Sequence, residues 1–239
     1  MKINQRSPVP ALLSYGIGVI IGFFVMVVAA WADMEASAYD FPRLAKAGLG
    51  GFHCPVLMTP AETSTITLDV SNTTEDQISP SVKTLISTRL LPEEFMENIQ
   101  LTPGASKKLE WSVDAENIDM GTFIFAKVLL FSAYPLPTLE ATCGIFVLDL
   151  PGTGRMIVPV LVVLSLISIG WGLHIINRFN TSNERLRKHL GSMAFLALMI
   201  GIGLVLSFMG GWISSLLVLV VTLLLIIILL SSVFVDKSR

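Results

Sequence analysis

Four long stretches of this 239-residue chain contain no aspartate, glutamate, lysine or arginine, and most of their residues are apolar. They cover residues 10–32, 156–176, 191–209 and 212–234. An α-helix rises about 1.5 Å per residue, so each stretch would form a helix of roughly 28–35 Å, which matches a hydrocarbon layer of about 30 Å. The sequence therefore predicts four transmembrane helices.

The charged residues are distributed unevenly around these stretches. Residues 33–155 hold 16 acidic and 8 basic residues, whereas the rest of the chain holds 2 acidic and 8 basic ones. The basic residues outside that block are Lys2, Arg6, Arg178, Arg185, Arg187, Lys188, Lys237 and Arg239. Because cytoplasmic loops are enriched in Lys and Arg, the N-terminus, the loop 177–190 and the C-terminus are predicted to be cytoplasmic. Residues 33–155 would then lie on the periplasmic or extracellular side of the cell membrane.

Short runs of alternating apolar and polar residues fill the block between the first two stretches. The clearest are 63–70, 81–90, 107–113, 121–132 and 141–150, and turn-forming residues separate them. A period of two is typical of strands with one buried face. Six or seven such strands at this spacing predict an antiparallel β-sandwich.

The two cysteines, Cys54 and Cys143, both fall in this block, near its ends. An oxidising compartment outside the cell membrane would permit a disulfide between them. Two unpaired, buried thiols are the alternative.

Three turn motifs in the block carry a resemblance. A strand ends in Val-Ser-Asn at 70–72, Leu-Thr-Pro-Gly-Ala-Ser at 101–106 precedes another strand, and Gly-Thr-Phe at 121–123 opens the next. In these motifs the block resembles immunoglobulin-like modules of prokaryotic surface proteins, of the alpha-galactosidase-associated and cell-adhesion-related types. The resemblance implies a non-enzymatic binding or spacer module. A bridge between the first and last strands would depart from the inter-sheet pair of antibody domains.

Together these features predict an integral membrane protein with four transmembrane α-helices and an all-β immunoglobulin-like sandwich inserted between helices 1 and 2. The expected domains are an N-terminal tail and helix (1–32), a linker or interfacial segment (33–53), the extracytoplasmic sandwich (54–152) and three further helices (153–239). The Ala-Trp-Ala sequence at 30–32 also fits a signal-peptide cleavage site, although the apolar run before it is long for one. Cleavage would leave three spans instead of four.

Residues that could perform chemistry are sparse. His53, Cys54 and Met58 suggest a soft-metal site, but the block holds no second histidine for a copper centre. The acidic cluster at 93–97 is interpreted as solvated loop residues, with calcium binding as the alternative. Asn72 begins a glycosylation sequon. The sequence contains none of the common nucleophile, nucleotide or metalloprotease motifs, so no catalytic residue, metal or cofactor is predicted.

Small residues in the apolar stretches predict close helix packing, since they let backbones approach. They are Ser14, Gly18, Gly22, Gly170, Gly201 and Gly203. The basic residues Arg178, Arg185, Arg187 and Lys188 would fix the topology or bind anionic lipid headgroups at the cytoplasmic face.

The expected function is a non-catalytic membrane subunit, not an enzyme, whose outer sandwich and helices bind other membrane protein subunits or a second copy of the chain. No nucleic-acid partner is expected. A surface receptor or adhesion module that binds an external ligand is the alternative. An oligomeric channel or transporter is a third possibility, although ion and proton carriers usually hold ionisable residues inside the membrane, and the apolar stretches hold none except His174 at a boundary.

Overall fold

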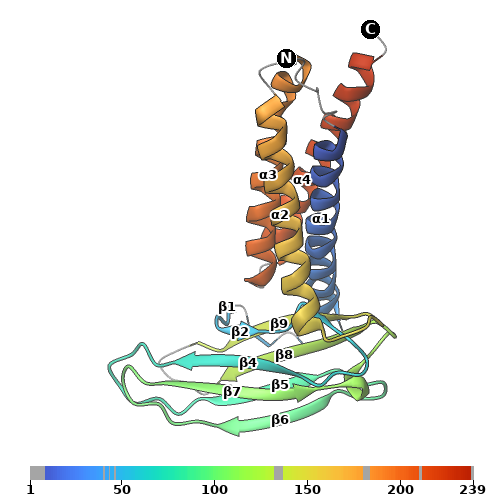
Figure 1. Ribbon diagram of the computed structural model, residues 1–239. Helices are drawn as coiled ribbons and strands as arrows, with labels where there is room; N and C mark the ends of the chain where they lie inside the picture. Colours follow the sequence, from blue (N-terminus) through green and yellow to red (C-terminus); the bar gives the residue numbers. More distant parts are fainter. Residues whose placement is uncertain are drawn as a thin grey trace. The chain divides into compact units, whose positions relative to one another are not determined.

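The structure, a computed structural model, describes residues 9–39, 41–42, 44–45, 47–131, 137–179, 184–209 and 212–237. Within these residues a long helix comes first, strands and one short 3₁₀ helix follow, and three long helices end the chain (Figure 1). The helices are α1 (Val9–Ala38), η1 (Ala115–Asn117), α2 (Gly154–Phe179), α3 (Glu184–Phe208) and α4 (Trp212–Lys237). The strands are β1 (Ala47–Gly48), β2 (Phe52–His53), β3 (Leu57–Met58), β4 (Ser64–Ser71), β5 (Ser81–Ile86), β6 (Glu93–Asn98), β7 (Ser106–Val113), β8 (Phe123–Phe131) and β9 (Leu139–Val147).

The chain divides into two compact units, and the divisions fall inside helices. One unit comprises Met1–Val27 and Val158–Arg239, and the other is Val28–Ile157. The predicted fold class is therefore wrong as stated. The β-containing unit is not all-β and is not simply inserted between helices 1 and 2, because the last turns of α1 and the first turn of α2 belong to it.

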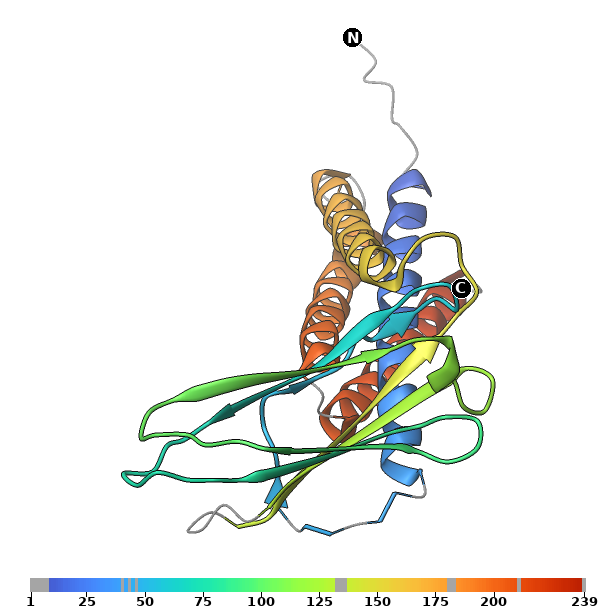
Figure 2. The same cartoon turned by 90° about the horizontal axis from the view of Figure 1, so that it is seen from below.

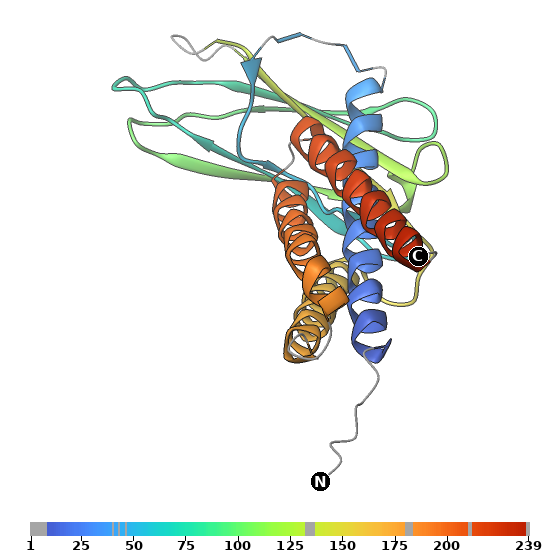
Figure 3. The same ribbon diagram turned by 90° about the horizontal axis from the view of Figure 1, so that it is seen from above.

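Four helices are long and apolar enough to cross a membrane, by length and composition. The candidate spans are Val9–Ala38, Gly154–Arg178, His189–Phe208 and Trp212–Ser231. Figure 3 shows these helices from above, running side by side. In the helical unit, Tyr15 donates a hydrogen bond to the carbonyl of Met193 over 2.7 Å, which joins α1 to α3.

Two sheets form the β unit (Figure 2). The six-stranded sheet has the order β1-β9-β8-β5-β6, with β3 also beside β9, and the three-stranded sheet has the order β2-β4-β7. The long strands pair antiparallel, whereas the short strands β1 and β3 run parallel to β9. The first short strands thus serve both sheets, since β2 pairs with β4 in one and β3 with β9 in the other.

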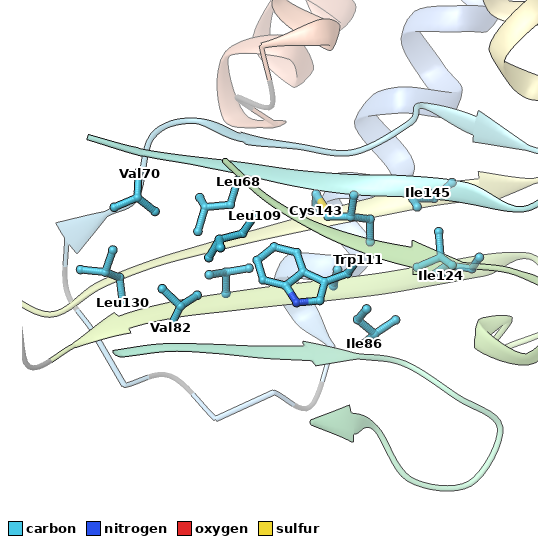
Figure 4. Close-up of a cluster of buried hydrophobic side chains, with 14 of the residues drawn as sticks. Leu68, Val70, Val82, Ile86, Leu109, Trp111, Ile124, Leu130, Cys143 and Ile145 are labelled. Atoms are coloured by element: carbon cyan, nitrogen blue, oxygen red, sulfur yellow. The ribbon is translucent and has the colours of Figure 1, made fainter. Parts of the chain in front are cut away.

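The core of the β unit lies between the two sheets and follows directly from the alternating sequence. Leu109, Trp111 and Val113 of β7 are buried and alternate with exposed neighbours. They pack against Ile124 and its alternate neighbours on β8 (Figure 4). Burying these side chains stabilises the folded unit by roughly 25 cal/mol per Å² of apolar surface removed from water.

The other face of β8 is also buried, beneath the end of α1. Phe123 and Phe125 alternate with the core residues of β8 and pack against Ala32 and Ala36, which lie one helical turn apart. Trp31 adds an edge-to-face contact with Phe123, at 5.8 Å between ring centroids. This packing accounts for the continuation of α1 as far as Ala38.

A glycine permits this close packing. A β-carbon at Gly144 of β9 would overlap the carbonyl of Ala32. The backbone N–H of Gly144 instead donates to Asp33 Oδ1 over 3.1 Å. The missing side chain of Gly144 thus lets α1 approach β9, and Asp33 accepts the N–H group that this approach brings near it. The sequence alone indicates neither residue.

Candidate functional site

The structure joins the two cysteines by a disulfide. Cys54 lies between β2 and β3, Cys143 lies in β9, and their Cα atoms are 6.3 Å apart across a sequence separation of 89 residues. The sulfur of Cys54 is therefore not available to act with His53 and Met58 as a metal ligand. Across the described ranges, His, Cys, Asp and Glu form no cluster of three or more that could hold a metal ion.

The Asn72 side chain of the sequon has a structural role. Its side chain is buried, and its Nδ2 donates to the carbonyls of Asp76 and Leu101 over 2.8 and 3.0 Å. Its Oδ1 accepts hydrogen bonds from the backbone N–H and the hydroxyl of Thr74. The amide that a glycan would modify is thus enclosed and fully hydrogen-bonded in the folded unit.

A buried ion pair lies on the outer face of the six-stranded sheet. Lys127 Nζ of β8 lies 2.9 Å from Glu140 Oε2 of β9, and the lysine side chain is only 4% exposed. The ammonium also donates to the carbonyl of Pro42 over 2.8 Å. The same carboxylate oxygen accepts the backbone N–H groups of Leu44 and Ala45. A lysine inside the most apolar predicted strand was the available sequence signal for this site, because a charge there needs a partner.

The surroundings of the pair affect its chemistry. Burial by itself raises the pKa of Glu140, but the hydrogen bonds from Leu44, Lys127 and Ala45 outweigh it, and the pKa lies below its usual value. The pair lines a pocket of about 680 Å³ together with the rings of Tyr39 and Phe41 and the side chain of Thr142. The two charges of the pocket are therefore already engaged with each other and with backbone groups.

A second candidate site is the free edge of β6. This strand pairs with β5 and ends the six-stranded sheet (Figures 1 and 2). Phe95 and Met96 in the strand are 37% and 53% exposed, and Leu90 and Leu91 just before it are 93% and 78% exposed. Exposed apolar residues on a sheet edge are notable, because an uncovered edge can pair with other chains, although the glutamates of β6 disfavour pairing with an uncharged or acidic strand.

A pocket of about 390 Å³ opens beside this edge. Phe95, Met96 and Glu97 of β6 line it on one side, and Glu110, Trp111 and Ser112 of β7 line it on the other. Trp111 is 5% exposed, and its indole N–H has no hydrogen-bond acceptor in the described part of the protein. An unsatisfied buried donor is costly, which makes this pocket a candidate for accepting an external group.

The predicted helix-packing residues fall into two groups. Ser14 donates to the carbonyl of Ser168 over 3.1 Å, and β-carbons placed at Gly18 or Gly22 would press on Ser165. The third helix contributes Gly203, whose β-carbon would meet Met26 and Val218. In contrast, β-carbons at Gly170 and Gly201 would meet no described atom of another element within 4 Å.

The predicted basic loop is largely helical. Arg178 is exposed in the last turn of α2, and α3 already begins at Glu184. The backbones of Arg185, Arg187 and Lys188 therefore lie in α3, and their side chains lie outside the described parts of the structure.

Comparison with known proteins does not identify a family. No family model matches the chain, and no curated protein matches it. Solved structures that align with part of this chain include the CARDB domain of a Pyrococcus furiosus protein in complex with di-metal ions. That match has 13% identity and a TM-score of 0.32, and covers 46% of this chain and 99% of the other.

Two enzymes give matches of similar quality. A Paenibacillus cycloisomaltooligosaccharide glucanotransferase complexed with cycloisomaltoheptaose matches with 15% identity and a TM-score of 0.34, over 44% of this chain and 14% of the enzyme. Bacteroides uniformis beta-glucuronidase 2 matches with 15% identity and a TM-score of 0.28, over 34% and 11%. The chain thus spans only a small part of these enzymes, and similarities at this level carry no argument about its activity.

Proposed function

We propose that this protein is a non-catalytic membrane subunit whose β unit binds another membrane protein through the free edge of β6. In this proposal α1 to α4 lie in the cell membrane, both termini are cytoplasmic, and the β unit is periplasmic or extracellular. The resemblance to surface modules supports a binding role for that unit.

The membrane location is supported by the surfaces of the helices. Leu217 and Ile228 of α4 are 64% and 61% exposed, and apolar residues surround them on every side of the helix. Water would oppose such a surface, whereas lipid or another apolar subunit would cover it favourably. The positions of the basic residues support cytoplasmic termini.

The observation that carries the binding role is the exposed apolar edge formed by Leu90, Leu91, Phe95 and Met96. Protein interfaces have apolar, aromatic and methionine-rich centres. Natural edge strands usually carry charged residues, and β6 carries three glutamates, so a partner that covers its exposed apolar residues would have to complement that charge.

The test is gentle detergent extraction from native membranes, followed by a native gel and mass spectrometry. Wild-type protein is compared with a variant in which Leu90, Leu91, Phe95 and Met96 are all replaced by Ser. Met120→Ser is the matched control, because Met120 is 67% exposed but lies outside β6.

Stoichiometric co-migration with another membrane protein, lost in the fourfold variant and kept in the control, is the expected result. Co-migration that survives in the fourfold variant would refute the role of β6. Migration of the wild type as a lone homo-oligomer would refute the accessory role itself.

A further inference from the structure

The strand register determines which side chains of β6 a partner would meet. Thr84 of β5 pairs with Phe95, and the pairs on either side join Val82 to Glu97 and Ile86 to Glu93. Val82 and Ile86 belong to the core between the sheets. Directly paired residues share a face, so Glu93, Phe95 and Glu97 lie on the inner face of β6.

These three side chains form an acid–aromatic–acid pattern at every second residue. Glu94 on the opposite face is neutralised by Lys83 at 2.7 Å. Within the described part of the chain, Glu93 and Glu97 have no ion-pair partner. Negative charge therefore remains on the inner face, on both sides of Phe95.

The inner face of β6 leads to Trp111. Phe95 and Glu97 line the pocket of about 390 Å³ that Trp111 also lines. Figure 4 shows the Trp111 indole between the sheets, with its nitrogen on the side of the ring that faces Val82 and Ile86. That N–H is buried and has no acceptor among the described residues. A side chain with a large apolar body and an acceptor at its tip would fill the pocket and satisfy the donor.

From these observations we infer that β6 binds an extended segment of the partner by strand addition, with the pattern basic–x–tyrosine–x–basic on its inner face. The two basic residues pair with Glu93 and Glu97, and the tyrosine packs beside Phe95 in the Trp111 pocket. Backbone hydrogen bonds to the free edge supply affinity, and the alternate side chains supply specificity. The pattern reads the same in both directions, so it fits a parallel or an antiparallel strand. This inference rests on the proposed function, because it specifies the partner segment that the β6 edge would bind.

The test measures binding of fluorescein-labelled peptides to the full chain in detergent, by fluorescence anisotropy at low ionic strength. The parent peptide is Thr-Lys-Thr-Tyr-Thr-Lys-Thr with blocked ends. Four variant peptides are used: one replaces both Lys by Glu, one replaces Tyr by Ser, and two carry N-methyl groups on alternate residues, one in each of the two registers. Glu93 and Glu97 are replaced together by Gln in the protein, and Glu75→Gln serves as the exposed control.

We expect the parent peptide to bind. Replacing Lys by Glu or Tyr by Ser in the peptide should each raise the Kd by about tenfold or more, and so should the E93Q/E97Q change in the protein. One N-methyl register should abolish binding and the other should retain it, since one edge of an added strand faces β6. The E75Q protein should bind like the wild type. Equal binding of both N-methyl registers, or of the acidic peptide, would overturn the inference.

The two proposals can fail separately. Loss of the native partner in the fourfold serine variant, without binding of any peptide, would leave the proposed function standing and overturn strand addition. Peptide binding with the expected pattern, while the native complex survives in that variant, would support strand addition and refute the proposed docking of the native partner.

Discussion

Replacing Glu140 by Leu should destabilise the β unit more than replacing Lys127 by Met, although both changes break the same ion pair. Without Glu140, the Lys127 ammonium remains 4% exposed, with the carbonyl of Pro42 as its acceptor. Without Lys127, the Glu140 carboxylate keeps the N–H groups of Leu44 and Ala45 and is 17% exposed. The stranded lysine is therefore the more costly of the two charges.

Removing one partner of a buried pair costs about 3–5 kcal/mol. The pair is partly open to solvent on the side of Glu140, so we expect Glu140→Leu to lower the free energy of unfolding by about 3 kcal/mol, at the low end of that range. Lys127→Met leaves a carboxylate that solvent and two N–H groups still reach, so we expect a smaller loss of about 1–2 kcal/mol. The double variant leaves no buried charge, so its loss should be close to that of Lys127→Met alone. The two changes should therefore be strongly non-additive.

Hydrogen exchange followed by mass spectrometry on the full chain in detergent can measure these effects in β8 and β9. A loss of about 3 kcal/mol corresponds to roughly 100-fold faster exchange for amides that open with the unit. Glu75→Gln is a surface control that should leave exchange unchanged. Equal effects of the two single variants, or additive effects in the double variant, would refute the assignment of Lys127 as the costly charge.

The pair also predicts a dependence on pH. The pKa of Glu140 in the folded protein lies below its ordinary value. A lowered carboxyl pKa contributes stability above the unfolded pKa, and this contribution is lost as the pH falls through the folded pKa. The wild-type β unit should therefore lose more stability than the double variant when the pH is lowered from neutral to below about 4.

Three further perturbations test other parts of the fold. Asn72→Ala should cost about 2–3 kcal/mol in the β unit, seen as faster exchange in β4, because it strands the buried groups that the amide now satisfies. Cys143→Ser should cost about 4 kcal/mol, and an unchanged melting temperature would contradict this. Cysteines introduced together as Ser14→Cys and Ser168→Cys should cross-link α1 to α2 on oxidation. Adding Gly18→Leu to this double variant should separate the two helices and prevent the cross-link, and an undiminished yield would contradict the packing.

The sequence predicts those strands in which the alternation of apolar and polar residues coincides with the alternation of buried and exposed positions. The alternation of Leu109, Trp111 and Val113 identifies β7 directly, because each of these side chains reaches the core. Strand β6 was missed and interpreted as loop, because three of its six residues are glutamates and it has no fully buried position. Only its register with β5 makes it a strand, and that register is a long-range property.

Other features depended on contacts that no local pattern contains. The sequence predicts a linker or interfacial segment at 33–53, because the stretch without charged residues ends at residue 32. Its first residues, 33–38, instead continue α1, because Ala36 packs beneath β8 and Asp33 accepts the N–H of Gly144. The ion pair of Lys127 and Glu140 could be suspected from a lysine in an apolar strand, but its partner could not be chosen among the acids of the block.

The route of the chain past Cys54 gives the two margins of the sandwich different mechanical properties. On one margin, β2 hydrogen-bonds to one sheet, β3 hydrogen-bonds to the other, and the disulfide fastens the crossing to β9. Separating the sheets there would require breaking backbone hydrogen bonds and a covalent bond. On the margin between β6 and β7, the described residues form no backbone pairing across the sheets. The sheets are therefore fastened on the β2–β3 side by backbone pairing and a disulfide, whereas on the side of the Trp111 pocket they are joined through the connection 99–105, where Leu101 pairs with Ile78.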